Sequence, residues 1–215
     1  MSEQNTTRIQ QGLEHSDSSV RLRAAMAAGT APAPGLVGTL IERCAVEPDF
    51  FVRDMLTWAL TRHPAALTVP GLVAELRAER AQARSQALHT LSKIGDRRAW
   101  PAITPELLAD ADDEVARSAW RAAVVLVPEG GEPALAAALA AQLGRGGRAT
   151  RLSLSQALIA LGEAGAPVLR AAATGPDPRV RRHAIATERL ACDPEAGFEA
   201  AIEEAKRLVA LGQEG

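Results

Sequence analysis

The sequence is poor in aromatic residues, cysteine and lysine. Its 215 residues include six aromatic side chains, no tyrosine, two cysteines and two lysines. β-Sandwiches and β-barrels fill their pleated faces with β-branched and aromatic residues, so this scarcity argues against both classes. Cys44 and Cys192 are far apart and belong to no metal-binding spacing, which indicates two reduced thiols and no metal site.

Strong positive charge and long apolar runs are also missing. The net charge of −2 and the isoelectric point near 6.1 argue against a dedicated nucleic-acid binder. The N-terminal residues 1–11 are polar, and no run of about 18 apolar residues occurs. We therefore expect no signal peptide and no membrane span, and a cytoplasmic location.

Three residue types dominate what is present. There are 45 alanines, 25 leucines and 22 arginines, and these are among the strongest helix formers. Because alanine is small, helices rich in it can approach each other closely. The composition predicts an all-α fold.

A repeat of about 32 residues organises the chain. Six segments share an apolar or small fourth residue, four of them open with Asp, and five carry Arg in the fifth place; they begin at Asp17, Asp49, Arg80, Asp112, Gly147 and Asp177. The residues four and eight places after this fourth residue are also apolar in almost every segment, so the three positions form one stripe along a helix. Glu188 in the last segment is the only polar residue of the stripe. Second apolar segments lie between these helices, with Pro34, Pro70, Pro101, Pro133 and Pro167 near their starts.

Each repeat is therefore predicted to be a helix pair, a first helix followed by a stripe-bearing second helix. Gly95 and Gly162 stand where the second helices of their repeats should stop. We predict a single domain, a right-handed α-solenoid of about six pairs with a C-terminal cap helix. The repeats span 6–28, 34–62, 69–95, 100–126, 132–162 and 166–191, and the cap helix spans 195–211.

The motif Asp-x-x-Val-Arg-x-x-Ala resembles the short HEAT repeat of the kind called PBS-lyase HEAT-like. The turn Gly95-Asp96-Arg97-Arg98-Ala99-Trp100-Pro101 is similar to the link of that family. The chain also resembles bacterial HEAT proteins that occur alone or joined to MerR-like regulators. The resemblance implies a solenoid fold and says little about function.

The repeated Asp and Arg are interpreted as structural. The aspartates precede the second helices, where a carboxylate can cap free amides and meet the positive end of the helix dipole. The arginine that follows is expected to reach the Asp or a carbonyl of the next repeat.

Function in a solenoid is expected where the repeats differ. On the faces of the second helices that point away from the core stripe, repeats two to four carry a polar and aromatic set: Asp54, Trp58, Arg62, Ser85, His89, Lys93, Arg117, Trp120 and Arg121. Trp58, His89 and Arg121 share one offset, which predicts a row on the concave side. Tryptophan and arginine are enriched at binding hot spots, and the cations outnumber Asp54.

We therefore expect a non-catalytic binding, scaffold or ligand-sensing module without a cofactor, whose partner is a protein segment or an anionic or aromatic ligand. In the other interpretation, Trp58 and Trp120 fill gaps between alanine-rich helices. Phe50 and Phe51 are expected to be one core residue and one partly exposed residue.

Catalytic interpretations rest on weaker signals. No histidine stands in a His-Glu dipeptide, so the di-iron hydroxylases built on HEAT repeats match poorly, and no nucleotide-binding or hydrolase motif occurs in the right context. Trp58, Trp120, Asp54 and Arg121 resemble the composition of the groove in HEAT-like alkylpurine DNA glycosylases. The isoelectric point and the shortage of lysine argue against that alternative. We predict no catalytic residues.

Overall fold

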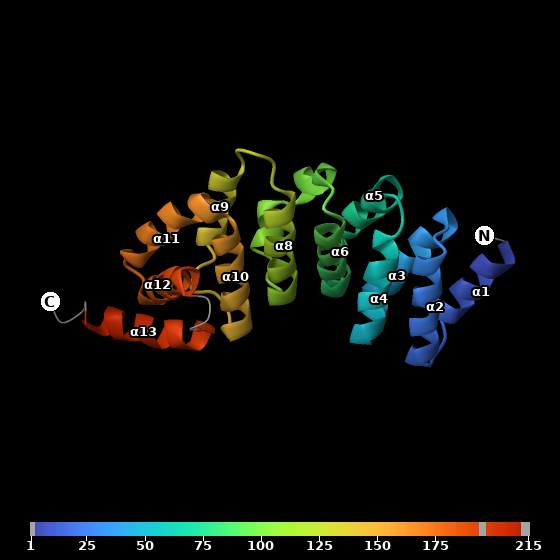
Figure 1. Ribbon diagram of the computed structural model, residues 1–215, viewed down its shortest axis with the longest axis horizontal. Coiled ribbons are helices and arrows are strands. Elements are labelled where there is room, and N and C mark those ends of the chain that lie inside the picture. Colours follow the sequence, from blue (N-terminus) through green and yellow to red (C-terminus); the bar gives the residue numbers. More distant parts are fainter. Residues whose placement is uncertain (1–2, 194–196, 212–215) are drawn as a thin grey trace. The chain divides into compact units, whose positions relative to one another are not determined.

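The computed structural model describes residues 3–193 and 197–211, and the described chain is all-α, with no strand (Figure 1). Its contacts divide the chain into two compact units, unit 1 (Met1–Ile103) and unit 2 (Thr104–Gly215). Each unit is built from helix pairs stacked side by side, as the repeat predicts.

Unit 1 contains three helix pairs. The first helices are α1 (Glu3–Leu13), α3 (Val37–Val46, preceded by the 3₁₀ turn η1, Pro34–Leu36) and α5 (Ala65–Glu75). The second helices are α2 (Ser18–Thr30), α4 (Phe50–Thr61) and α6 (Ala81–Ile94), and the unit ends in the 3₁₀ helix η2 (Arg97–Ala102). Helix α4 packs between α2 and α6.

Unit 2 continues the same plan. The first helices are α7 (Pro105–Leu108), α9 (Glu132–Ala140) and α11 (Gly165–Ala173, preceded by the turn η3, Gly162–Ala164). The second helices are α8 (Asp113–Leu126), α10 (Arg148–Ala160) and α12 (Pro178–Cys192), followed by α13 (Gly197–Leu211). Helix α10 packs between α8 and α12.

The predicted stripe forms the core of each unit. Its members four and eight residues after the fourth position are buried in every repeat except at Glu188, which is half-buried: Ala24, Ala28, Leu56, Leu60, Ala87, Leu91, Ala119, Ala123, Leu154, Leu158 and Ala184. Several of the alanines are completely covered, because the absence of a long side chain lets the paired helix close over them.

The repeated aspartates cap helices, as predicted. Asp17, Asp49, Asp112 and Asp177 each accept a hydrogen bond from a backbone N–H in the first turn of the helix that follows. Helices α6 and α10 begin with Arg80 and Gly147 at this place and have no side-chain cap.

The repeated arginine has a different partner from the one expected. Four of these arginines bond in the same way: Arg21, Arg53, Arg84 and Arg181. The Nη1 atom of each donates to the backbone carbonyls five and six residues earlier, in the turn that precedes the helix carrying the arginine. The expectation of a carbonyl in the next repeat is wrong because helical side chains tilt towards their own N-terminus. Each arginine therefore fixes the turn inside its own pair.

Glycine and proline mark most of the predicted boundaries. Gly95 ends α6 with a φ of 70°, and Gly162 follows α10 with a φ of 56°, both in the left-handed region that favours glycine. Pro70 departs from the prediction, since it lies inside α5. That helix begins at Ala65 because Pro64 already supplies a rigid turn and a carbonyl for the first amides.

Helix α13 covers α12 in unit 2 (Figure 1). Phe198, Ala201 and Ala205 pack on Ala186 of α12, and Leu152 of α10 joins this cluster. An ion pair between Arg148 and Glu199 adds a second link to α10. The first residues of the predicted cap helix, 195 and 196, lie outside the described part of the chain.

In the described residues, no single helix has both the length and the apolarity needed to cross a membrane. One pair, Arg148–Ala160 with Gly162–Ala173, meets the length and composition criterion only when the two helices, bent by 113°, are taken together.

Candidate binding surface on helix α4

The residues predicted for the site in unit 1 are mostly accessible. Asp54, Arg62 and Lys93 are exposed, Trp58 is 40% exposed, and His89 is half-buried. Ser85 is the exception, because it is buried and its hydroxyl donates to the carbonyl of Gln82 in its own helix. Ser85 is therefore not accessible to a binding partner.

In unit 2, Trp120 does not reach the surface either. Its ring is fully buried, and Nε1 donates to the carbonyl of Leu108 at 2.8 Å. The gap-filling interpretation therefore applies to Trp120, since the ring is enclosed and the Leu108 carbonyl satisfies the indole N–H. Trp120 is removed from the predicted binding set.

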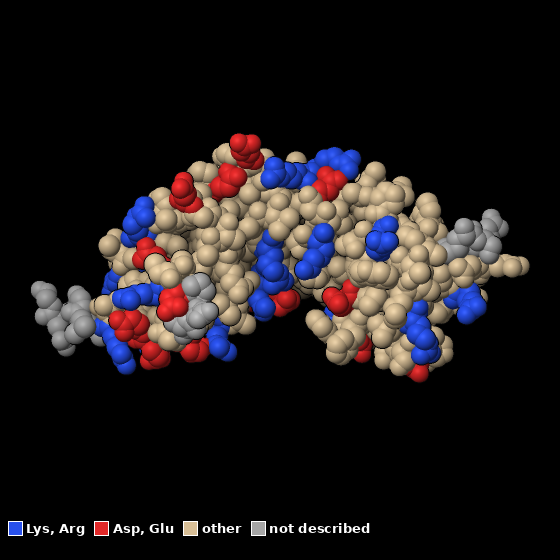
Figure 2. All heavy atoms as spheres, in the orientation of Figure 1, with Lys and Arg blue, Asp and Glu red and all other residues tan. Residues whose placement is uncertain are grey.

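Arg117 and Arg121 lie on the outer side of α8 in unit 2. Both pair with Glu114, at 3.0 Å and 3.8 Å, and Arg121 also donates to Ser118 Oγ. Partial burial lowers the pKa of Arg121, against the opposing effect of Glu114. Figure 2 shows basic side chains over α8, but both arginines already have an acidic neighbour.

Two of the three residues in the predicted row lie on neighbouring helices. Trp58 is on α4 and His89 is on α6, and these helices pack together with Thr57 Oγ1 and Thr90 Oγ1 3.4 Å apart. Arg121 belongs to unit 2, so the complete row remains a prediction.

Two aromatic residues at the start of α4 are both exposed, although one of them was expected in the core. Phe50 is 65% exposed and Phe51 72% exposed, so neither belongs to the core. They occupy the first turn of α4, where the turn that enters the helix leaves both rings outside the helix pair. Their rings meet edge to face with centroids 5.7 Å apart, and the Arg53 guanidinium lies 6.0 Å from the Phe50 ring centre.

Helical spacing unites these residues into one face. Phe50, Asp54 and Trp58 are four residues apart, so they follow one side of α4. The four-residue spacing is visible in the sequence. One of the two phenylalanines was expected in the core because phenylalanine is usually buried.

Trp58 extends this face onto α2. A Cβ atom at Gly29 would lie 2.2 Å from Cζ3 of Trp58, so the indole ring lies directly on the glycine backbone. Met26, one turn earlier on α2, is 47% exposed. We call Met26, Phe50, Phe51, Asp54, Trp58 and Arg62 the α4 surface.

A buried carboxylate fixes the turn in front of the α4 surface. Glu47 is fully buried and accepts two hydrogen bonds from Arg21, one from Arg43 and one from the backbone N–H of Asp49. Burial alone would raise its pKa, but the two guanidinium groups and the amide outweigh it and hold the pKa of Glu47 at about 2. The Glu47 carbonyl in turn accepts from Arg53 and Gln82, so this turn is tied to all three helix pairs of unit 1.

A buried Ser–His contact in unit 2 lacks the geometry of a catalytic pair. In unit 2, His183 Nε2 lies 3.1 Å from Ser155 Oγ, but Nδ1 accepts from the Gly144 N–H, so Nε2 carries the proton and donates to the Arg151 carbonyl. Burial lowers the pKa of His183 to about 4, and Ser155 and His183 are both buried. A protonated Nε2 cannot remove the serine proton, so this cluster is a structural network.

No metal site emerges from the described side chains. Among residues 3–193 and 197–211, no three His, Cys, Asp or Glu side chains gather as they would around a metal ion.

Comparisons with known proteins support the fold. No protein-family model and no curated protein matches the sequence. Among solved structures, the complex of CpcE and CpcF of phycocyanin lyase from Nostoc sp. PCC7120 is similar, with a TM-score of 0.52, 18% identity, and coverage of 93% of this chain and 86% of that chain. Human deoxyhypusine hydroxylase gives a TM-score of 0.49 at 20% identity over 97% of this chain and 96% of that one.

The karyopherin Kap121p, bound to the extreme C-terminus of the protein phosphatase Cdc14p, gives a TM-score of 0.60 at 17% identity. The match covers 96% of this chain but 25% of the karyopherin chain. The lyase complex and the karyopherin are HEAT-repeat solenoids, and the chain has this fold.

Proposed function

We propose that this chain is a non-catalytic binding or scaffold module and that the α4 surface binds a segment of a partner protein. The observation that carries the proposal is the exposure of Phe50, Phe51 and Trp58 on one helix. These are half of the six aromatic residues of the chain, and exposed clusters of large apolar side chains mark interaction sites.

The surface has the composition of a binding hot spot. Aromatic rings supply large contact areas with few rotatable bonds, so ordering them costs little on binding. The α4 surface carries one charge of each sign, Asp54 within α4 and Arg62 just after it, which favours a partner segment with polar groups beside its apolar side chains. The Glu47 network and the contact of Trp58 with Gly29 keep these side chains on a rigid base.

The alternative of a DNA glycosylase has lost part of its basis. It required Trp120 in a groove, and this side chain is buried and bonded to Leu108. A ring in that position cannot stack on a flipped base.

The proposal is tested by comparing partners captured by three proteins. The variant Phe50→Ser/Phe51→Ser/Trp58→Ala removes the exposed rings, and Leu67→Ser removes an exposed leucine of α5 in the same unit (44% exposed) as the matched control. Proteins cross-linked to each are quantified by mass spectrometry, and circular dichroism verifies folding. We expect a defined partner to be retained by wild type and Leu67→Ser and lost from the triple variant.

Binding of the purified partner then gives the magnitude. A hot spot contributes about 2 kcal/mol or more, so the triple variant should weaken the Kd by about 30-fold or more. Equal affinities for wild type and triple variant would contradict the α4 surface as the site.

A further inference from the structure

A hollow in unit 2 shares no lining residue with the α4 surface. It is a groove of about 890 Å³ bordered by α10, α11, α12 and α13, and we call it the α12 groove. Its apolar walls are formed by Leu158, Ile159, Leu169, Ile185 and Leu208. The volume lies within the range of sites that hold small organic ligands.

The groove exists where the repeat pattern fails. In the other complete repeats the last stripe position is a buried leucine or alanine, as at Leu91 and Ala123, whereas α12 has the half-buried Glu188. Helix α13 does not cover the groove, because it packs on α12 with Phe198, Ala201 and Ala205. Its Leu208 lines the groove and is 38% exposed. Apolar walls are thus left facing solvent.

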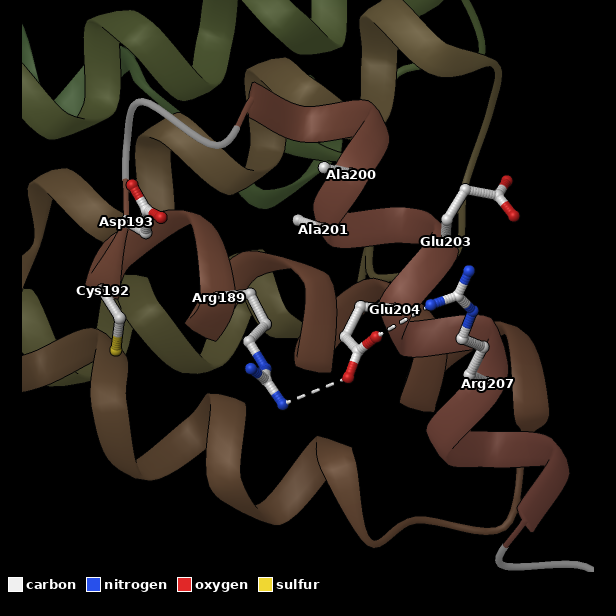
Figure 3. A pocket seen from close by; sticks show the side chains of 8 residues that line it. All are labelled: Arg189, Cys192, Asp193, Ala200, Ala201, Glu203, Glu204 and Arg207. Carbon is white, nitrogen blue, oxygen red and sulfur yellow. Dashed lines mark ion pairs between the residues drawn. The ribbon is translucent and has the colours of Figure 1, made fainter.

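The charged groups at the groove favour an anion. Arg170 and Arg189 line it together with the single acid Glu188. Arg170 is exposed and makes no hydrogen bond or ion pair with any described residue. Arg189 is held only loosely, since its Nη2 lies 3.8 Å from Glu204, which also lies 3.8 Å from Arg207 (Figure 3).

Figure 3 shows the adjoining pocket of about 530 Å³, which shares Arg189 and Cys192 with the α12 groove. The Arg189 guanidinium and the Glu204 carboxylate point towards each other there. The shared arginine therefore stands between an aliphatic groove on one side and a polar pocket on the other.

We propose that the α12 groove binds a single-chain aliphatic carboxylate, that is, a free fatty acid. The large apolar residues of the described lining are all aliphatic, with no aromatic ring among them, so they suit a flexible hydrocarbon chain and offer no stacking partner for a planar ligand. The carboxylate is bound by Arg170, whose planar guanidinium can donate two parallel hydrogen bonds, and Arg189 adds positive charge. The hydrocarbon chain lies along Leu158, Leu169 and Leu208.

Cys192 offers a direct reporter of occupancy. Its thiol is exposed and lines the groove. The other cysteine, Cys44, is buried in unit 1, and burial raises the pKa of its thiol to about 12, so it reacts slowly with thiol reagents. A ligand in the groove should therefore slow the modification of Cys192.

The experiment follows the rate of Cys192 modification by a chromogenic disulfide in the full chain. Dodecanoate is compared with dodecyltrimethylammonium, which has the same chain and the opposite charge, both below their micellar concentrations. Cys192→Ala gives the background rate. Arg170→Gln removes the proposed carboxylate partner, and Arg182→Gln, an arginine of α12 outside the lining, is its matched control.

We expect dodecanoate to slow the reaction in a saturable manner and the ammonium compound to have little effect. Arg170→Gln should weaken dodecanoate binding by about tenfold, the effect of losing one charge-assisted hydrogen-bonding group, while Arg182→Gln changes it less than twofold. Glu188→Gln should strengthen binding, because a repelling carboxylate is removed. No protection by dodecanoate, equal protection by both amphiphiles, or protection unchanged in Arg170→Gln would each overturn the proposal.

Discussion

At the scale of single residues, Glu47 is the most constrained group in unit 1. A fully buried carboxylate is costly unless its charge is compensated, and here two arginines and one amide compensate it. Its removal would leave Arg21, which is only 6% exposed, as a buried cation without its partner. The loss of stability on removing Glu47 therefore includes the penalty of an unpaired buried Arg21 as well as the loss of the contact itself.

We expect Glu47→Gln to lower the free energy of unfolding by about 3 to 5 kcal/mol at neutral pH, because the charge of Arg21 becomes uncompensated. Urea denaturation followed by circular dichroism measures the change. Glu42→Gln, an exposed residue of α3, is the control and should stay within about 0.5 kcal/mol of wild type. A similarly small effect of Glu47→Gln would contradict the role of the Glu47 charge in compensating Arg21.

At the scale of helices, the contact between α2 and α4 depends on a glycine. Gly29 is buried against Trp58 and Ala59, and its missing side chain is the space that the indole ring occupies. The same contact places Trp58 on the α4 surface and keeps it partly exposed, so packing and the proposed binding function depend on one pair of residues.

Gly29→Ala should destabilise the protein by about 1 to 3 kcal/mol, since the new Cβ overlaps the ring of Trp58. In a Trp58→Ala background the cost should be smaller, and a double-mutant cycle by urea denaturation gives the coupling energy.

The matched control for this cycle is Gly38→Ala, because a Cβ there would meet nothing within 4 Å. It lies inside helix α3 and should stabilise the protein by about 0.5 to 1 kcal/mol, the usual gain of alanine over glycine in a helix. Additive effects of Gly29→Ala and Trp58→Ala would contradict the proposed overlap.

At the scale of the whole molecule, the chain consists of two compact units, and each contains a buried polar network that links its helices. In unit 1 the network surrounds Glu47. In unit 2 it joins His183 to Gly144, Ser155 and Thr187, which connects α12 with α10 and with the turn after α9. The neutral form of His183 is required there, because Nδ1 must accept from the Gly144 amide.

This network predicts a loss of stability in mild acid. The unfolded chain protonates this histidine below its ordinary pKa of about 6.5, whereas the folded chain does so only near pH 4. Between these values the unfolded state binds more protons, so stability is complete above about pH 6.5 and falls as the pH falls towards 4. We expect a loss of about 2 kcal/mol at pH 5 relative to pH 7.5.

Urea denaturation at several pH values measures this dependence. His183→Asn should be less stable at neutral pH but should lose less stability between pH 7.5 and pH 5 than wild type. His15→Gln, a change at an exposed histidine, should keep the wild-type slope. The same slope in His183→Asn as in wild type would assign the acid sensitivity to other groups.

Much of the fold could be predicted from the sequence because the repeat is a local pattern. The spacing of Val52, Leu56 and Leu60 places three side chains on one side of any α-helix, and burial of that side follows. Asp49 could be assigned as a cap because a cap bonds within its own first turn. Such statements need no knowledge of neighbouring helices.

The candidate site was less predictable because exposure depends on neighbours. Trp58 and Trp120 occupy similar outward positions in their repeats, yet one lies on a glycine at the surface and the other is enclosed and bonded to Leu108. Phe50 and Phe51 were expected to be one core residue and one partly exposed residue, and both are exposed.

The helical class, the repeat, its buried stripe and its aspartate caps thus follow from the order of the amino acids, because all of them arise from contacts within a turn or two of helix. The packing of the helices sets which tryptophan is buried, which arginines have partners, and where the stripe leaves a groove at Glu188. Those outcomes depend on contacts with other helices and turns, and helical periodicity contains no information about such contacts.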